Sequence, residues 1–245
     1  MPASRFFKIL HSVDSTNNYA MAQVHAGLAR HGMAWFACEQ TAGKGQRGNG
    51  WETEPGKNIA LSLVLQPELT KITAGFHLGA IVALACHDLF SIYAGNETSI
   101  KWPNDLYWRD RKAGGILIET VYQGSTWKFA VVGIGININQ TKFGEPLKHA
   151  VSLRQITGKE HDPAILGEEL YDLLMKRVNA PGPASFENVL ETYNRHLYGL
   201  NKTTRLKKDN AVFETVIKEV NHQGQLVTVD AVERCFDFGE VVWSH

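Results

Sequence analysis

Residues 115–138 read GILIETVYQGSTWKFAVVGIGINI, a stretch rich in β-branched side chains. Its pattern predicts two strands, at 115–122 and 128–138, and Gln123-Gly124-Ser125 predicts the turn that joins them. Upstream, residues 72–93 carry apolar side chains three and four positions apart, which predicts a long packed helix. The core is therefore expected to contain both strands and a helix.

Further elements are expected on both sides of this stretch. Before it, the pattern predicts strands at 6–10, 33–39 and 58–65, a helix from Ser15 or Thr16 to Gly27, and an extended run at 99–102 that Pro103 stops. After it, two helices are expected at about 163–179 and 184–198, separated by Pro181-Gly182-Pro183. From residue 200 the pattern predicts a small all-β unit of about 45 residues, with short strands at 203–207, 211–219, 225–229 and 232–238.

The composition excludes several classes of protein. The chain has 245 residues and is 44% hydrophobic, which suits one large domain, or a medium domain with a small appendage. Lys and Arg number 25, as do Asp and Glu, so the formal net charge is zero. That balance argues against a general nucleic-acid coat or a polybasic membrane patch, but not against a local basic pocket for a small anion.

The cysteines and the N-terminus indicate the cellular compartment. Cys38, Cys86 and Cys235 are odd in number and widely spaced, which does not suit a disulfide framework or a zinc site. Cys38 and Cys86 lie in apolar runs and are expected to be buried. The N-terminus turns polar too early for a signal peptide, and no apolar run approaches the ~20 residues that cross a bilayer. A cytoplasmic protein is expected.

A glycine-rich loop spans residues 41–50, Thr-Ala-Gly-Lys-Gly-Gln-Arg-Gly-Asn-Gly. Lys44 and Arg47 stand among glycines that let backbone N–H groups approach a ligand closely, which suits a phosphate. The loop is neither a Walker A loop nor a dinucleotide-binding fingerprint, since no Gly-Lys-Ser/Thr ends it and no helix pattern follows. A plain surface loop is the alternative, although Trp51 after it could lie over an anionic or planar ligand, and a mobile loop could act as a lid.

The segment Lys101-Trp102-Pro103-Asn104-Asp105 is the second unusual cluster. Lys101 could be a surface lysine at a strand end, followed by a turn. It could equally point a fixed positive charge into a site and stabilise a pentavalent phosphorus transition state.

Two further segments place glycines inside strands. In the first, Lys112 precedes Gly114 and Gly115, so a ligand or another backbone could approach there, or Lys112 could be a solvated lysine. In the second, Gly133 and Gly135 alternate with β-branched residues and leave one face of the strand bare. That face could hold a planar ligand or pack closely against a helix, and Asn137 could read an adenine edge or cap the strand.

These four segments, in this order, resemble the biotin–protein ligases, the BirA-like family. The hallmarks of that family are a glycine-rich GRGRRGxxW loop, a KWPND segment, a K-x-x-GIL-x-E strand and a GxGIN strand. They correspond here to Gly43–Trp51, Lys101–Asp105, Lys112–Glu119 and Gly133–Asn137. The resemblance covers the whole chain, including the small C-terminal β unit.

The resemblance implies roles for individual residues. Lys101 matches the catalytic lysine. The residues expected to contact biotin are Ser15, Thr16, Asn17, Gln40, Lys44, Gly45, Gln46, Lys101 and Gly115. Those expected to contact ATP or the adenylate are Lys44, Arg47, Trp51, Lys101, Asn104, Lys112, Gly135 and Asn137. Read without the resemblance, Ser15-Thr16-Asn17 would only cap a helix.

The resemblance also implies a fold and a reaction. The fold is a mixed β-sheet flanked by helices, like that of class II tRNA synthetases, over residues 1–199, with an SH3-like barrel at 200–245. The reaction joins biotin to ATP as biotinyl-5′-AMP and then transfers biotin to a lysine of a biotin carboxyl carrier protein. Mg²⁺ is expected to be held mainly by phosphates, so no protein side chain is assigned as a metal ligand. Asp105 is a weak candidate for one carboxylate ligand.

Three features bear on variation within the family. Lys44 replaces the commoner arginine and Gln46 replaces a second one, which puts retention of the reactive intermediate in doubt. Phe6 already begins the catalytic domain, so the monofunctional class without a DNA-binding domain is expected, with no specific DNA binding.

The alternative functions are a lipoate ligase or octanoyltransferase, a biotin-sensing DNA-binding regulator, and a non-catalytic nucleotide-binding module. A homodimer through a sheet edge is left open.

Overall fold

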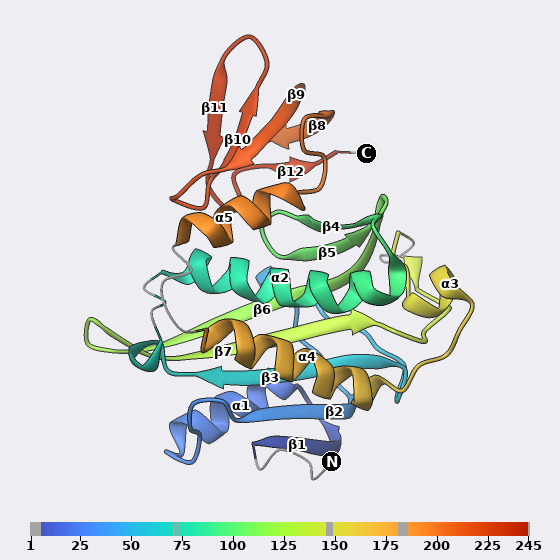
Figure 1. Ribbon diagram of the computed structural model, residues 1–245, viewed down its shortest axis with the longest axis vertical. Helices are drawn as coiled ribbons and strands as arrows, with labels where there is room; N and C mark the ends of the chain where they lie inside the picture. Colours follow the sequence, from blue (N-terminus) through green and yellow to red (C-terminus); the bar gives the residue numbers. More distant parts are fainter. Residues whose placement is uncertain (1–5, 71, 73, 146–148, 181–185, 245) are drawn as a thin grey trace.

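The computed structural model describes residues 6–70, 72, 74–145, 149–180 and 186–244, which form two sheets with helices around the larger one (Figure 1). The larger sheet has seven strands in the order β1-β2-β3-β7-β6-β5-β4. β1 and β2 are parallel, whereas the other neighbours are antiparallel, so the sheet is mixed. The strands are β1 (Phe7–Val13), β2 (Ala34–Gln40), β3 (Asn58–Leu65), β4 (Thr98–Lys101), β5 (Asp105–Trp108), β6 (Arg111–Gln123) and β7 (Thr126–Asn137).

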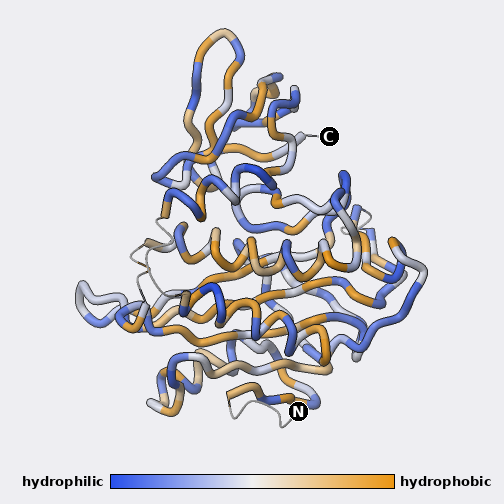
Figure 2. The backbone as a smooth tube through the Cα atoms, in the orientation of Figure 1, coloured by the Kyte–Doolittle hydropathy of each residue, from blue (hydrophilic) through white to orange (hydrophobic). Residues whose placement is uncertain are grey.

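Helices lie on both faces of this sheet. α2 (Gly75–Ala94) and α4 (Pro163–Val178) pack on one face, and α1 (Thr16–His25) packs on the other. The remaining helices are α3 (Leu153–Thr157) and α5 (Phe186–Arg195). β3 is buried along its whole length because it lies between these layers, and its side chains alternate between them. Figure 2 shows the resulting apolar run through the central strands.

α2 is the described helix whose length and composition would suit a membrane span, with a mean hydropathy of 1.5 in its most apolar window. The expectation that no apolar run reaches such a length was therefore wrong. The helix is nevertheless 61% buried in that window, packed on the sheet beside α4 and α5. Its apolar character is accounted for by its place in the protein core.

The second sheet is antiparallel and contains C-terminal residues. Its order is β11-β10-β9-β8-β12. Its strands are β8 (Thr203–Lys208), β9 (Ala211–Val220), β10 (Leu226–Val229), β11 (Glu233–Phe236) and β12 (Val242–Trp243). β11 and β12 are its two edges and do not pair with each other, so the described strands form no closed barrel.

The two sheets are tied together by apolar packing and by hydrogen bonds. Leu206 and Ile217 of the second sheet belong to the same hydrophobic cluster as the core of the first. The Asn194 side chain donates to the Val220 carbonyl at 2.9 Å and accepts from the Val220 amide at 2.8 Å. The predicted division at residue 199/200 falls between α5 and β8 and stays a prediction.

Most of the predicted elements are present, with shifted ends. The strand predicted at 58–65 is β3 at the same residues, and the helix predicted at 72–93 is α2, which begins at Gly75. β5 and β12 were not predicted, because each is short and lacks an apolar alternation. α3 is a single short turn that was also missed. The predicted break at Pro181-Gly182-Pro183 lies outside the described residues.

The cysteines follow their expected burial in part. Cys86 is buried, whereas Cys38 is half-buried near the end of β2, where the strand leaves the core. Cys235 is exposed, and all three are free thiols.

Candidate functional site

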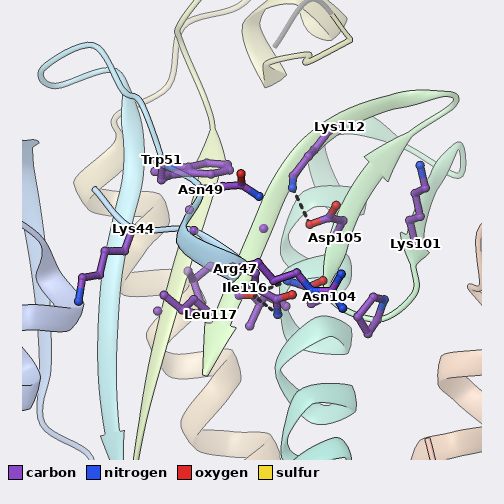
Figure 3. Close-up of a pocket in the computed structure, with 18 of the residues that line it drawn as sticks. Lys44, Arg47, Asn49, Trp51, Lys101, Asn104, Asp105, Lys112, Ile116 and Leu117 are labelled. Atoms are coloured by element: carbon purple, nitrogen blue, oxygen red, sulfur yellow. Dashed lines mark hydrogen bonds and ion pairs between the residues drawn. The ribbon is translucent and has the colours of Figure 1, made fainter. Parts of the chain in front are cut away.

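A cavity of about 700 Å³ lies where the two sheets meet. It brings together the start of α1, the glycine-rich loop, the 101–107 segment, β6, β7 and the C-terminal residues 238–243. Fourteen of the predicted site residues line it: Ser15, Thr16, Asn17, Gln40, Lys44, Gly45, Gln46, Arg47, Trp51, Lys101, Asn104, Lys112, Gly115 and Gly135. Figure 3 shows ten of the lining residues labelled around the cavity.

One end of the cavity is a buried polar slot. Gln40 Oε1 accepts from the Thr16 amide at 2.8 Å and from the Thr16 hydroxyl at 3.1 Å. The Ser62 hydroxyl donates to Asn17 Oδ1 at 2.5 Å, and its oxygen lies 2.8 Å from Thr16 Oγ1. Asn17 Nδ2 donates to Glu119 Oε2 at 2.9 Å. These bonds fix the slot before any ligand enters, which suits recognition of a small polar group.

Two members of this network were not assigned from the sequence. Ser62 is a hydroxyl inside the otherwise apolar run of β3, and that interruption was its signal. Glu119 stands at the last position of the K-x-x-GIL-x-E motif, but its contact with Asn17 depends on the fold. Ser62 contacts Thr16 and Asn17, and Glu119 contacts Asn17, so these two residues orient the side chains that line the slot.

Ser15 is the N-cap residue of α1 by position, but its side chain makes no capping hydrogen bond. Its backbone is extended and its side chain is buried beside the cavity. The Gln40 carboxamide accepts the Thr16 N–H instead, so a residue from β2 satisfies the start of the helix. The capping interpretation is therefore wrong for the Ser15 side chain, which is left facing the site.

The alternating glycines of β7 make room for two site residues. A Cβ built on Gly133 would clash with the Asn17 carboxamide, and a Cβ built on Gly135 would clash with the Trp51 indole. The bare face of the strand is thus covered by these side chains, both of which line the cavity. Trp51 Nε1 is buried and has no hydrogen-bond partner among the described residues, so it is a donor that a ligand could use.

We expect Gly135→Ala to displace Trp51 and to raise about tenfold the KM for ATP, the nucleotide that the sequence resemblance implies, which is the equivalent of ~1.4 kcal/mol. Steady-state kinetics would measure the KM, and circular dichroism would check the fold. Gly79→Ala is the matched control, since a Cβ there meets open space. The same substitution in a Trp51→Ala background should have little effect. An unchanged KM in folded Gly135→Ala would contradict the role of this contact.

The glycine-rich loop is folded over the cavity. The Trp51 amide donates to the Gly43 carbonyl at 2.8 Å, and the Gly45 amide donates to Asn49 at 2.8 Å, so the loop closes on itself. Gln46 Nε2 donates to the Ile116 carbonyl at 3.4 Å. In this position Gln46 ties the loop to β6 through a neutral side chain, whereas an arginine would bring a charge.

Lys101 lies at the far end of the cavity in a cage of aromatic rings. Its Nζ donates to Tyr107 Oη at 3.1 Å and is 4.5 Å from the centre of that ring. The rings of Tyr198 and Trp243 lie 5.5 Å and 5.1 Å away. Burial lowers the pKa of Lys101 to about 8, Asp105 opposes this shift and Lys112 adds to it. The group is therefore a desolvated ammonium that loses its proton in mild alkali.

Lys112 lies nearer the middle of the cavity. Its Nζ is 2.7 Å from Asp105 Oδ1 and 6.0 Å from the centre of the Trp51 ring. A Cβ on Gly115 would come within 3.5 Å of the same Nζ. Figure 3 shows the Lys112–Asp105 pair between Trp51 and Lys101.

Asn104 and Asn137 have different surroundings. Asn104 lines the cavity, and its Nδ2 donates to the Ile116 carbonyl at 2.6 Å. Asn137 is buried outside the cavity lining, and its Nδ2 donates to the Val151 carbonyl at 3.2 Å. Its amide thus joins the end of β7 to the following loop, so the structure does not bring Asn137 to the cavity with the others.

The C-terminal unit supplies part of the cavity wall, with Phe238, Gly239, Val241, Val242 and Trp243. None of these residues was assigned to the site from the sequence, since no motif there carries a chemical signal. Trp243 reaches Lys101, and Phe238 reaches Arg47. The contacts depend on how the two sheets are placed.

Comparison with known proteins gives a consistent set of relatives. The model of the Biotin/lipoate A/B protein ligase family matches residues 9–137. The biotin–[acetyl-CoA-carboxylase] ligase of Paracoccus denitrificans is 35% identical over 76% of this chain and 74% of its own length. The bifunctional ligase/repressor BirA of Bacillus subtilis is 28% identical over 89% of this chain and 68% of its own length.

A solved structure has the same fold. The biotin protein ligase from Aquifex aeolicus, in complex with biotin and ATP, superposes with a TM-score of 0.82 at 23% identity. The match covers 98% of both chains, so the shared fold includes both sheets.

Proposed function

Because this chain belongs to the Biotin/lipoate A/B protein ligase family, we propose that it is an ATP-dependent biotin protein ligase. It activates biotin as biotinyl-5′-AMP and transfers it to a lysine of a biotin carboxyl carrier domain. The observation that carries the proposal is one cavity that joins a buried polar slot to a cationic loop and two lysines. A neutral ring system and an anionic nucleotide need that combination.

The two ends of the cavity would hold the two substrates. The slot at Ser15, Thr16, Asn17 and Gln40 would hydrogen-bond the ureido end of biotin. Gly115 would let the biotin chain pass close to β6. Trp51 over Gly135 would form the adenine side, with Lys44 and Arg47 of the loop above the phosphates. Asn137 would support this side through the backbone of Val151.

The proposed reaction requires electrostatic stabilisation of its transition state and no protein nucleophile. The biotin carboxylate attacks the α-phosphorus of ATP, the bond to pyrophosphate breaks, and pyrophosphate leaves. A carrier lysine amine then attacks the acyl carbon and AMP leaves. The attacking carboxylate and the α-phosphate are both anionic, so fixed cations lower the barrier where negative charge is shared.

Two lysines are proposed to supply that charge at different points. Lys112 lies beside Gly115 and Trp51. These two residues would bracket the junction of carboxylate and phosphorus in the proposed binding mode, so we assign Lys112 to the junction. Lys101, the lysine expected from the sequence to be catalytic, keeps that proposed role from the far end of the cavity, facing the polyphosphate. Binding of ATP would favour its protonated form, because a nearby anion raises the pKa of an ammonium.

Mg²⁺ would enter with ATP. Asp105 and Glu52 are the carboxylates of the described cavity lining, and no described group of three His, Cys, Asp or Glu side chains could hold a metal by itself. One carboxylate with several phosphate oxygens is a usual Mg²⁺ environment, so Asp105 is the candidate ligand. The ion would neutralise charge on the leaving pyrophosphate.

Several finer points belong to the same proposal. Residues 1–199 would form the catalytic domain and residues 200–245 an SH3-like unit, supported by the separate antiparallel sheet. The partner would be a carboxylase biotin-carrier domain, with no specific DNA binding, no membrane association and a cytoplasmic location. A homodimer could form through β1, an edge strand on which Ile9 is 53% exposed.

Pyrophosphate exchange into ATP, with biotin and lipoate compared side by side, tests the function. Exchange should depend on biotin and be far slower with lipoate. An acyl-cysteine transferase is disfavoured because none of the three cysteines lines the cavity. Exchange that depends on lipoate and not on biotin would overturn the proposal.

A further inference from the structure

The guanidinium of Arg47 rests on the C-terminal unit. Its Cζ lies 4.6 Å from the centre of the Phe238 ring. A Cβ built on Gly239 would overlap the same guanidinium, so the group lies directly against the Gly239 backbone. Residues nearly two hundred positions apart in the chain thus form one contact at the cavity wall.

The backbone on both sides of this contact is specialised. Arg47 has φ +56°, a left-handed conformation that costs energy for a residue with a side chain. Gly239 has φ +92° in a turn where the Glu240 amide donates to the Asp237 carbonyl at 3.0 Å. A glycine is needed at position 239 both for this conformation and for the approach of Arg47.

Phe238 is in turn held by the catalytic unit. Its ring meets the Trp102 indole edge to face at 6.3 Å between centroids. Trp102 Nε1 donates to the Gly224 carbonyl at 2.9 Å, which fixes the indole between the two units. The ring that receives Arg47 therefore has a defined position even though Phe238 is 52% exposed.

The charge of Arg47 remains available to a ligand. Arg47 makes no ion pair with a carboxylate in the described part of the chain. An aromatic face and a glycine backbone orient a guanidinium without neutralising it. The other described side-chain tie of the loop tip is the 3.4 Å hydrogen bond from neutral Gln46 to Ile116.

We propose that Phe238 and Gly239 are positioning residues that hold Arg47 over the cavity, so that the loop stays closed on the biotinyl-adenylate. The C-terminal unit then sets how long the reactive intermediate is retained. This inference rests on the proposed biotin-ligase function. It also gives a means of retention in a loop where Lys44 and Gln46 replace arginines.

The test measures escape of the intermediate. Biotinyl-adenylate would be formed in the enzyme, and its release followed by rapid dilution and by biotinylation of a bystander protein present in excess. Phe238→Leu keeps apolar bulk and removes the ring, and should raise the release rate about two- to fivefold, the equivalent of ~0.5–1 kcal/mol. Phe238→Trp should restore retention. Gly239→Ala should raise release at least as much.

Two controls separate positioning from general structure. Gly158→Ala carries a similar left-handed strain, with φ +72° and open space around its Cβ, and should leave release unchanged. In an Arg47→Ala background, Phe238→Leu should have no further effect, because the residue acts through Arg47. Unchanged release in Phe238→Leu, or an equal effect without Arg47, would overturn the inference. If the unaltered enzyme forms no biotinyl-adenylate, the proposed function fails instead.

Discussion

Lys112→Ala is expected to slow formation of biotinyl-adenylate by about 10²–10³-fold, the usual loss when one transition-state cation or donor is removed. The physical reason is the position of the ammonium, 2.7 Å from Asp105 and between Gly115 and the Trp51 ring. Without it, the biotin carboxylate and the α-phosphate would meet with Asp105 unpaired beside them. Single-turnover formation at saturating biotin measures the change, and the affinity for biotin should fall less than the rate.

Lys128→Ala is the matched control for this variant. The Lys128 side chain is 35% exposed and pairs with Glu68 at 3.4 Å, whereas the Lys112 side chain is 33% exposed and paired with Asp105. Lys128 lies outside the cavity lining, so its loss should leave the rate within about twofold. A change of less than about threefold in Lys112→Ala would show that the charge at the junction comes from another cation.

Lys101→Ala is expected to reduce adenylate formation by a comparable ~10²–10³-fold and to remove an alkaline limb from the pH profile. The folded-state pKa of Lys101 is about 8, well below its ordinary value, because burial disfavours the charged form. The ammonium is therefore lost as the pH rises through about 8. Since kcat/KM reports the free enzyme, kcat/KM for ATP should fall above that pH.

The fall in kcat should occur at a higher pH than the fall in kcat/KM, because the phosphates of bound ATP raise the pKa of Lys101. Lys101→Arg should restore little activity, since a planar guanidinium is larger and places its charge differently in the cage of Tyr107, Tyr198 and Trp243. If Lys101→Ala keeps the alkaline limb of the parent enzyme, another group is titrating and the assignment of that limb to Lys101 is wrong.

Local sequence was sufficient for the elements whose own pattern is strong. β3 and α2 are long and apolar, so burial in the core follows from their side chains. The glycines of β7 predicted a close approach, and the structure gives the reason as Asn17 and Trp51. β5 could not be predicted, because its four residues are strand only through pairing with β4 and β6.

The candidate site was also predictable from the sequence only in part. The four motif segments were recognisable because their residue types are unusual for ordinary loops and strands, whereas Ser15, Thr16 and Asn17 were assigned only through the family resemblance. Their grouping in one cavity follows from sheet register, which places Lys101 opposite Asp105 and Asp105 opposite Gly115. Asn137 is two residues beyond Gly135 on β7 but donates to the Val151 carbonyl and does not line the cavity.

The sequence by itself determined which residues could carry charge, hydrogen bonds and close backbone approach, because these properties belong to single side chains and glycines. Only the tertiary structure decided where each lysine lies, since strand pairing sets side-chain direction. It also decided which C-terminal residues reach the cavity: Trp243 contacts Lys101, and Phe238 contacts Arg47. Contacts between segments so far apart in the chain depend on packing of the whole core, which no local pattern encodes.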